Sequence, residues 1–201
     1  MNNEQTRART LWMVQTAILS AIIILMSFTP LGYLRAGVIE ITFIMIPVAV
    51  GAILMGPATG ALLGAVFGIT SFLQAVLGFS AFGVALLQIN PFFTFILTMV
   101  PRVLMGWLVG LIFQTLHKVD RTKIMSFAVA SLSGALINTI LFVGGLFLLF
   151  GQTDYIRSFG PTVPTIIALL VSVNAALEAA ISLIVGTAVT KALYRVVRKS
   201  E

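Results

Sequence analysis

Long apolar runs separated by short polar segments dominate the chain, and their lengths are typical of membrane-spanning helices. A helix needs about 20 mostly apolar residues to cross a hydrocarbon core of about 30 Å. The sequence predicts six such spans, at residues of about 11–29, 39–55, 58–78, 91–116, 124–150 and 163–190. We therefore predict an all-α membrane protein, a six-helix bundle that forms one integral membrane domain over residues 1–201.

The composition supports this class and disfavours several kinds of chemistry. The chain is 59% hydrophobic and only 9% charged, whereas a soluble domain carries about 25% charged residues. Cysteine is absent and histidine occurs once, so neither a disulfide framework nor a metal site is expected. An enzyme that uses Glu178 as acid or base is disfavoured, because no Ser-His pair, nucleophile elbow or metal-ligand cluster accompanies it.

The basic residues outside the spans predict the orientation in the membrane. If six spans are counted, nine basic residues fall on one side and two, Arg35 and Arg157, on the other. The nine are Arg7, Arg9, Lys118, Arg121, Lys123, Lys191, Arg195, Arg198 and Lys199. Cytoplasmic loops carry the excess of Lys and Arg. Both termini are therefore expected to be cytoplasmic, and the segments near residues 35, 85 and 157 to face outward.

Glycine recurs every four residues at the start of the third span, at Gly56, Gly60, Gly64 and Gly68. Residues i and i+4 lie on the same face of a helix, so this face is almost bare backbone. The row is not a phosphate-binding loop, because no Lys-Ser or Lys-Thr follows it. We expect another helix to pack closely against it.

Arg102 lies near the middle of the fourth span. A charge at this depth costs roughly 2.5–3.5 kcal/mol on insertion scales, so it is tolerated when it faces the protein interior and meets a partner. The preceding residue, Pro101, lacks a backbone N–H and frees carbonyls of the preceding turn. These carbonyls are candidates to receive a ligand.

Other buried polar residues are predicted at a similar depth. At 1.5 Å of rise per residue, Arg102 and Asn138 each lie about 18 Å from the outer end of their spans, and Asn174 and Glu178 lie about 16 and 22 Å from theirs. This layer allows two interpretations. It binds a polar ligand at the midplane, or Arg102 pairs with Glu178 and the asparagines bond across helices, which would only hold the bundle together.

The run FTPLGYLRAGVIEITFIMIPVAVGAILMGPATGALLGAVFGITSF resembles the substrate-binding S-components of energy-coupling factor (ECF) vitamin transporters. Its most distinctive part, MGPATGALLGAVFG, is similar to the hallmark L-G-P-x-x-G-x-x-x-G-x-x-F-G of that family, with Met55 in place of leucine. The first span adds an A-x-x-x-A pair, Ala17 and Ala21. Within the family, the run 28–72 and the INP…VPRVLMG segment are most similar to the pantothenate-specific members.

The resemblance implies a vitamin-binding subunit, not an enzyme, in the plasma membrane of a prokaryote. Its expected partners are a transmembrane coupling protein and two ATPases, so that ATP is used by the partners and no cofactor is bound by this chain. Ala17 and Ala21 would contact the coupling protein. The outward segments 30–40, 78–90 and 151–162 would gate access to the vitamin.

Among vitamins, the polar layer favours pantothenate, a small anion with hydroxyl and amide groups. Arginine is a bidentate partner for a carboxylate, Asn138 and Asn174 are suited to the hydroxyl or amide groups, and Phe67 to the geminal methyl groups. The predicted ligand-binding residues are Arg102, Asn138, Asn174, Phe67 and Glu178, with Tyr33 and Gln88 as candidates from the outward loops.

Two alternatives remain open at this point. The first is an S-component for another vitamin, namely folate, riboflavin, pyridoxine or a thiamine precursor. The second is a secondary transporter that works alone, although the internal repeat typical of such proteins is not evident.

Overall fold

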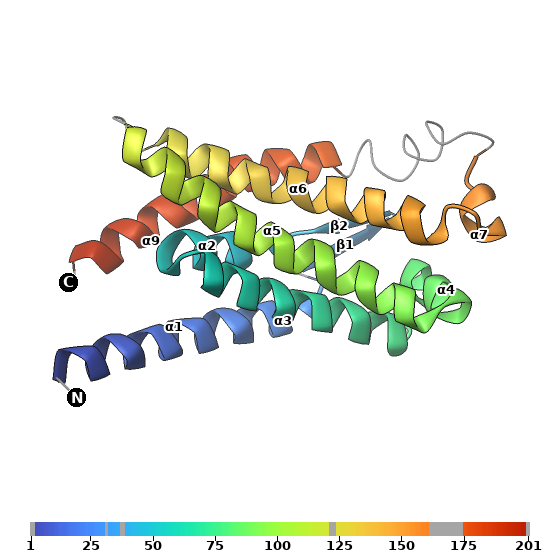
Figure 1. Cartoon of the computed structure of the whole chain (residues 1–201), viewed down its shortest axis with the longest axis horizontal. Helices are drawn as coiled ribbons and strands as arrows, with labels where there is room; N and C mark the ends of the chain where they lie inside the picture. Colours follow the sequence, from blue (N-terminus) through green and yellow to red (C-terminus); the bar gives the residue numbers. More distant parts are fainter. Residues whose placement is uncertain (1–2, 31, 37–38, 121–123, 161–174, 200–201) are drawn as a thin grey trace.

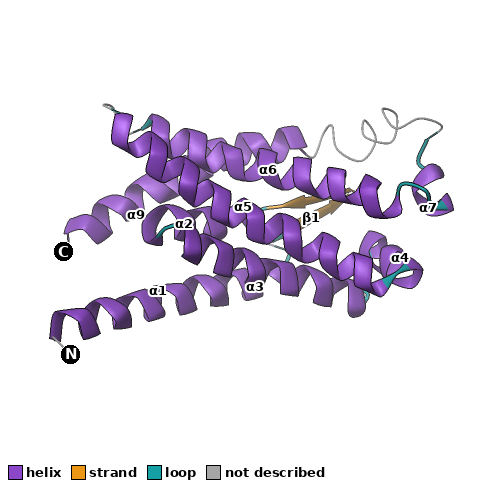
Figure 2. Cartoon of the chain, viewed as in Figure 1, coloured by secondary structure: helices purple, strands orange, loops and turns teal. Residues whose placement is uncertain are grey.

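The computed structural model describes residues 3–30, 32–36, 39–120, 124–160 and 175–199. Within these ranges the chain is nearly all helical, with one short β-hairpin (Figure 2). The elements are α1 (Asn3–Ser27), β1 (Tyr33–Ala36), β2 (Ile39–Thr42), α2 (Met45–Met55), α3 (Pro57–Val76), α4 (Ala81–Ile89), α5 (Pro91–Val119), α6 (Met125–Phe150), α7 (Asp154–Arg157), the π-helix η1 (Ser182–Gly186) and α9 (Thr187–Lys199).

Five helical segments are long and apolar enough to cross a membrane: Gln5–Ser27, Pro57–Val76, Pro91–Val119, Met125–Phe150 and Ala175–Tyr194. The sixth, α2, is shorter, with 11 residues. The predicted all-α membrane fold is confirmed. The start of α1 and the end of α9 lie at the same end of the elongated bundle (Figure 1).

The prediction for the second span is wrong at its start. Instead of a helix from residue 39, Ile39–Thr42 forms strand β2 and pairs antiparallel with β1, with Tyr33 opposite Thr42. Alternating β-branched residues fit a strand better than a helix, and the helix begins only at Met45. The segment 30–40, predicted as an exposed loop, therefore includes most of a hairpin whose Tyr33 is buried.

The segment 78–90 is not a loop, because α4 occupies most of it. Its helix begins after Ser80, whose hydroxyl accepts a hydrogen bond from Gly83 N–H at 3.1 Å. Asn90 in turn caps α5, its Oδ1 accepting from Phe93 N–H at 3.1 Å. Such caps satisfy donors at the first turn of a helix. Gln88 is accordingly a helical residue rather than a loop residue.

The glycine row packs against α5, as the sequence predicts for some neighbouring helix. A Cβ atom added to Gly60 would lie 2.2 Å from the carbonyl oxygen of Gly106, and one added to Gly64 would lie 2.2 Å from that of Arg102. The two helices thus touch backbone to backbone. This close approach holds the backbone of Arg102 directly over the bare face of α3.

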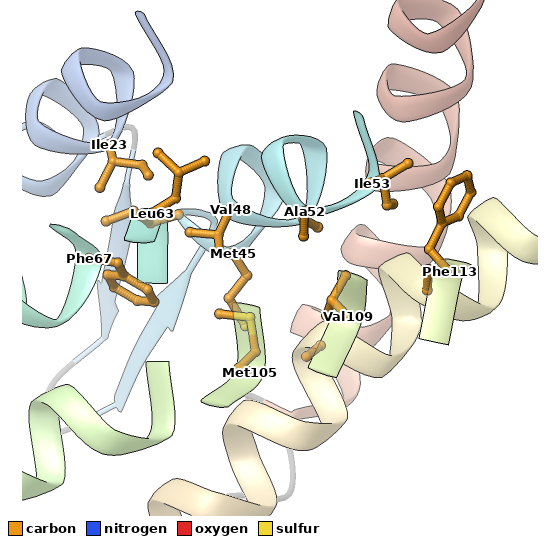
Figure 3. Packing of buried hydrophobic residues seen from close by; sticks show 14 of the residues in the cluster. Ile23, Met45, Val48, Ala52, Ile53, Leu63, Phe67, Met105, Val109 and Phe113 are labelled. Carbon is orange, nitrogen blue, oxygen red and sulfur yellow. The ribbon is translucent and has the colours of Figure 1, made fainter. Parts of the chain in front are cut away.

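The main core lies where α2, α3 and α5 meet, with contributions from α1 and α6. Figure 3 shows Ile23, Leu63, Phe67, Met45 and Met105 converging in this core. All five are at most 2% exposed. The short helix α2 is enclosed by the longer helices, because eight of its 11 residues are buried. Phe67 belongs to this core, and its ring also contacts Arg102.

Candidate functional site

The guanidinium group of Arg102 lies beside two aromatic rings. Its Cζ atom is 4.9 Å from the ring centroid of Phe142 on α6 and 5.4 Å from that of Phe67 on α3. Both distances are within the range of a cation–π interaction, which strengthens when the cation is desolvated. The ring of Phe67 is fully buried. Three helices thus meet at this one cation.

The guanidinium also forms a hydrogen bond to its own helix. Arg102 Nη1 donates to the carbonyl oxygen of Leu97 at 2.8 Å. Leu97 precedes Pro101 by four residues, so its carbonyl is the one that loses its helical donor at the proline. The sequence predicted that carbonyls freed by Pro101 would receive a ligand. In the structure this carbonyl instead accepts from the arginine.

This contact also changes the depth of the positive charge. Helical side chains lean toward the N-terminus of their helix, and the Arg102 side chain reaches back to Leu97. Leu97 is seven residues from Asn90, which corresponds to about 10 Å. The guanidinium therefore lies nearer the α4 end of the bundle than the 18 Å predicted from the position of its Cα atom.

Glu178 lies in the last span and is 6% exposed. Its Oε1 accepts a hydrogen bond from the backbone N–H of Thr42 at 2.7 Å, so the carboxylate fastens the hairpin to this span. Arg102 also acts electrostatically on this carboxyl group. Each of the two side chains has a hydrogen bond to backbone.

Two buried polar oxygens near these groups lack a hydrogen-bond partner among the described residues. They are Asn138 Oδ1 on α6 and Thr42 Oγ1 at the end of β2. Asn138 is 6% exposed and Thr42 is 9% exposed. An unsatisfied buried polar group costs about 1–3 kcal/mol, and such groups in a folded protein often mark a place for a ligand or a water molecule.

Asn138 and Phe142 are four residues apart on α6, so they lie on the same face, about 6 Å apart along the helix axis. Since Phe142 contacts the guanidinium, the Asn138 amide is about one turn farther from the α4 end. The predicted group of Arg102, Asn138, Phe67 and Glu178 is thus brought to one region of the bundle interior.

The remaining predicted site residues are Tyr33, Gln88 and Asn174. The Tyr33 hydroxyl lies 3.3 Å from Ser71 Oγ on α3, and the side chain belongs to the main core cluster. Gln88 is exposed on α4, at one end of the bundle (Figure 1). Asn174 lies outside the described residues. The segment 151–162 is described only up to residue 160.

Sequence reasoning missed Phe142, Thr42 and the Leu97 carbonyl. Phe142 could have been found from its spacing of four residues from Asn138, which places both on one helix face. Thr42 could not, because its bond to Glu178 joins residues 136 positions apart. The Leu97 carbonyl was one of those freed by Pro101. Its hydrogen bond from Arg102 could be predicted only by knowing the direction of the arginine side chain.

An apolar helical bundle with a cation, a carboxylate and an amide in its interior is a polytopic membrane protein with an internal polar site. The chain belongs to the family described as "ECF transporter, substrate-specific component", which matches residues 12–189. It is a multi-pass protein of a prokaryotic plasma membrane. The resemblance to the S-components predicted from the glycine motif is confirmed.

Two curated relatives carry more particular names. The chain is 33% identical to "Pantothenate transporter PanT" of Leuconostoc mesenteroides subsp. mesenteroides, over 70% of this chain and 68% of that protein. It is 29% identical to "Pantothenic acid transporter PanT" of Lactococcus lactis subsp. cremoris, over 77% of this chain and 78% of that protein. The predicted likeness to pantothenate-specific members is therefore confirmed as well.

Proposed function

We propose that this chain is the membrane subunit that captures pantothenate from outside the cell for ATP-driven uptake by partner subunits. The observation that carries the proposal is a cation inside the bundle, held against Phe67 and Phe142. One turn from Phe142 on α6 is Asn138, whose side-chain oxygen has no hydrogen-bond partner among the described residues. The names of both curated relatives support the choice of vitamin.

Pantothenate has a carboxylate at one end, hydroxyl groups at the other and an amide between them. In this proposal the carboxylate binds Arg102, because guanidinium and carboxylate form two parallel hydrogen bonds. The amide or hydroxyl groups then reach Asn138, which is about 6 Å from Phe142 along α6. Asn174 is proposed to assist there, and Glu178 to hold the hairpin against the site.

Partners are proposed from the family and from the exposed face of α1. Ala17 and Ala21 are both exposed in the isolated chain, and small residues allow the backbone of another helix to approach closely. We propose that this pair contacts the transmembrane coupling protein. The ATPases would act through that protein, and the chain itself would bind the vitamin without a cofactor.

The test compares Arg102→Ala with Arg7→Ala, a matched control on an arginine that is exposed on α1. Both proteins are purified in detergent, and pantothenate binding is measured by calorimetry. Truncating one partner of a hydrogen-bonded charge pair that the ligand buries costs about 2–5 kcal/mol, so Arg102→Ala is expected to weaken binding at least about 30-fold. Arg7→Ala should bind like the wild type.

A thermal-shift panel tests the choice of ligand. A ligand that binds only the folded state raises the melting temperature as its concentration exceeds its Kd. Pantothenate should stabilise the wild-type chain at the lowest concentration, ahead of folate, riboflavin, pyridoxine and thiamine precursors. Stabilisation by one of the others at a lower concentration would reassign the vitamin. Undiminished pantothenate binding by Arg102→Ala would contradict the proposed carboxylate contact.

A further inference from the structure

We propose that Pro101 is a positioning residue for the substrate carboxylate, acting through the Leu97 carbonyl and Arg102. Proline at this position leaves the carbonyl without a helical donor, and the carbonyl then fixes the direction of the guanidinium. The inference rests on the proposed contact between Arg102 and the carboxylate, and it gives Pro101 a role beyond shaping the helix.

Pro101 removes one hydrogen bond from the backbone of α5. This helix is continuous from Pro91 to Val119, with Pro101 inside it. In an uninterrupted α-helix the N–H of residue 101 would donate to the carbonyl of residue 97. Proline has no N–H, so the Leu97 carbonyl has to find its donor elsewhere.

The Leu97 carbonyl lies in a part of the bundle that is shielded from bulk solvent. Leu97 is 1% exposed, and Pro101 is also buried. An unpaired carbonyl in the interior of a membrane-spanning helix is unfavourable. Arg102 Nη1 provides the donor at 2.8 Å, and the bond is strengthened because the donor is charged.

The hydrogen bond to the Leu97 carbonyl orients the guanidinium of Arg102. The rings of Phe67 and Phe142 contact it from α3 and α6, and the Leu97 carbonyl holds Nη1 from α5. A contact with a ring face sets no direction within the guanidinium plane, whereas a directional hydrogen bond to one nitrogen helps to set which edge is presented. A pre-oriented edge favours bidentate binding of a carboxylate, because less conformational freedom is lost on binding.

The test is Pro101→Ala, which restores an N–H that donates to the Leu97 carbonyl and competes with Arg102. We expect pantothenate affinity to fall about tenfold, while affinity for panthenol, which has an alcohol in place of the carboxylate, stays within about twofold of the wild type. The ligand-free protein should be at least as thermostable as the wild type, because proline inside a helix is unfavourable.

Two further variants separate the missing N–H from the proline ring. Incorporation of lactic acid at position 101 gives a backbone ester that lacks both the ring and the N–H, and it should retain wild-type affinity for pantothenate. Pro47→Ala changes another buried proline, in α2, and should not produce the selective loss of pantothenate over panthenol.

The inference is overturned if Pro101→Ala binds pantothenate like the wild type, or if it weakens both ligands equally, while Arg102→Ala still abolishes pantothenate binding. An equal loss would mean that the proline only shapes the helix. If Arg102→Ala binds pantothenate normally, the proposed carboxylate contact fails first, and the role of Pro101 falls with it.

Discussion

Replacing Gly64 by alanine would test how closely α3 and α5 must approach for the site to form. The new Cβ atom would lie 2.2 Å from the Arg102 carbonyl oxygen, 2.8 Å from its carbonyl carbon and 3.1 Å from Val103 Cα. All three are backbone atoms, so no side chain can turn aside. Helix α5 would have to move away by about 1.2 Å to reach an ordinary van der Waals contact.

The expected cost combines two opposing effects. Overpacking in a well-packed interior costs typically about 1–3 kcal/mol, whereas alanine is favoured over glycine inside a helix by about 1 kcal/mol. The net loss of stability is therefore at most about 2 kcal/mol, or at most roughly 8 °C in melting temperature for a chain of this length. Pantothenate affinity should fall as well, because the shift moves Arg102 relative to Phe67.

Gly144→Ala is the matched control, because this glycine lies on α6 and nothing is within 4 Å of the Cβ atom it would acquire. It should leave the melting temperature unchanged or raise it by up to about 4 °C through helix propensity alone. Both proteins are melted in detergent with and without pantothenate. If Gly64→Ala is as stable as Gly144→Ala and binds as well as the wild type, the reasoning from the backbone contact is refuted.

Two further predictions concern docking and the hairpin. Ala17→Trp should leave pantothenate binding by the purified chain intact and abolish uptake when the chain is co-expressed with its coupling protein and ATPases; loss of binding would mean that the residue acts within the chain. Glu178→Gln keeps an acceptor for Thr42 N–H and should cost under about 1 kcal/mol of stability, whereas Glu178→Leu leaves that N–H unpaired and should cost about 1–3 kcal/mol. Equal effects of the two changes, measured by thermal unfolding and by hydrogen exchange of the Thr42 amide, would show that the charge and not the acceptor matters.

Several properties of this protein follow from sequence alone, because they depend on one helix at a time. Hydropathy along the chain predicts the spans, and the repeat of four residues predicts the bare face that includes Gly60 and Gly64. Counting residues along a helix also indicates that Arg102 and Asn138 lie deep in the bundle. Each of these inferences uses only the rise and period of a regular helix.

The start of α2 was mispredicted because apolar residues are compatible with either a strand or a helix when the segment is short. The hairpin is held by the pairing of β1 with β2 and by the hydrogen bond from Thr42 N–H to Glu178. The second contact joins residues 136 positions apart, which hydropathy in a local window cannot connect.

The tertiary structure alone decided which groups surround the arginine. Depth along a span is one coordinate, but contact also requires the rotation of each helix and the identity of its neighbours, and these come from packing over the whole bundle. The packing of α3 on α5, the ring of Phe142 against the guanidinium, and the turn of Arg102 back to the Leu97 carbonyl are all of this kind. Sequence therefore determined that a cation lies within a membrane span, and three-dimensional packing determined what holds it and which way it points.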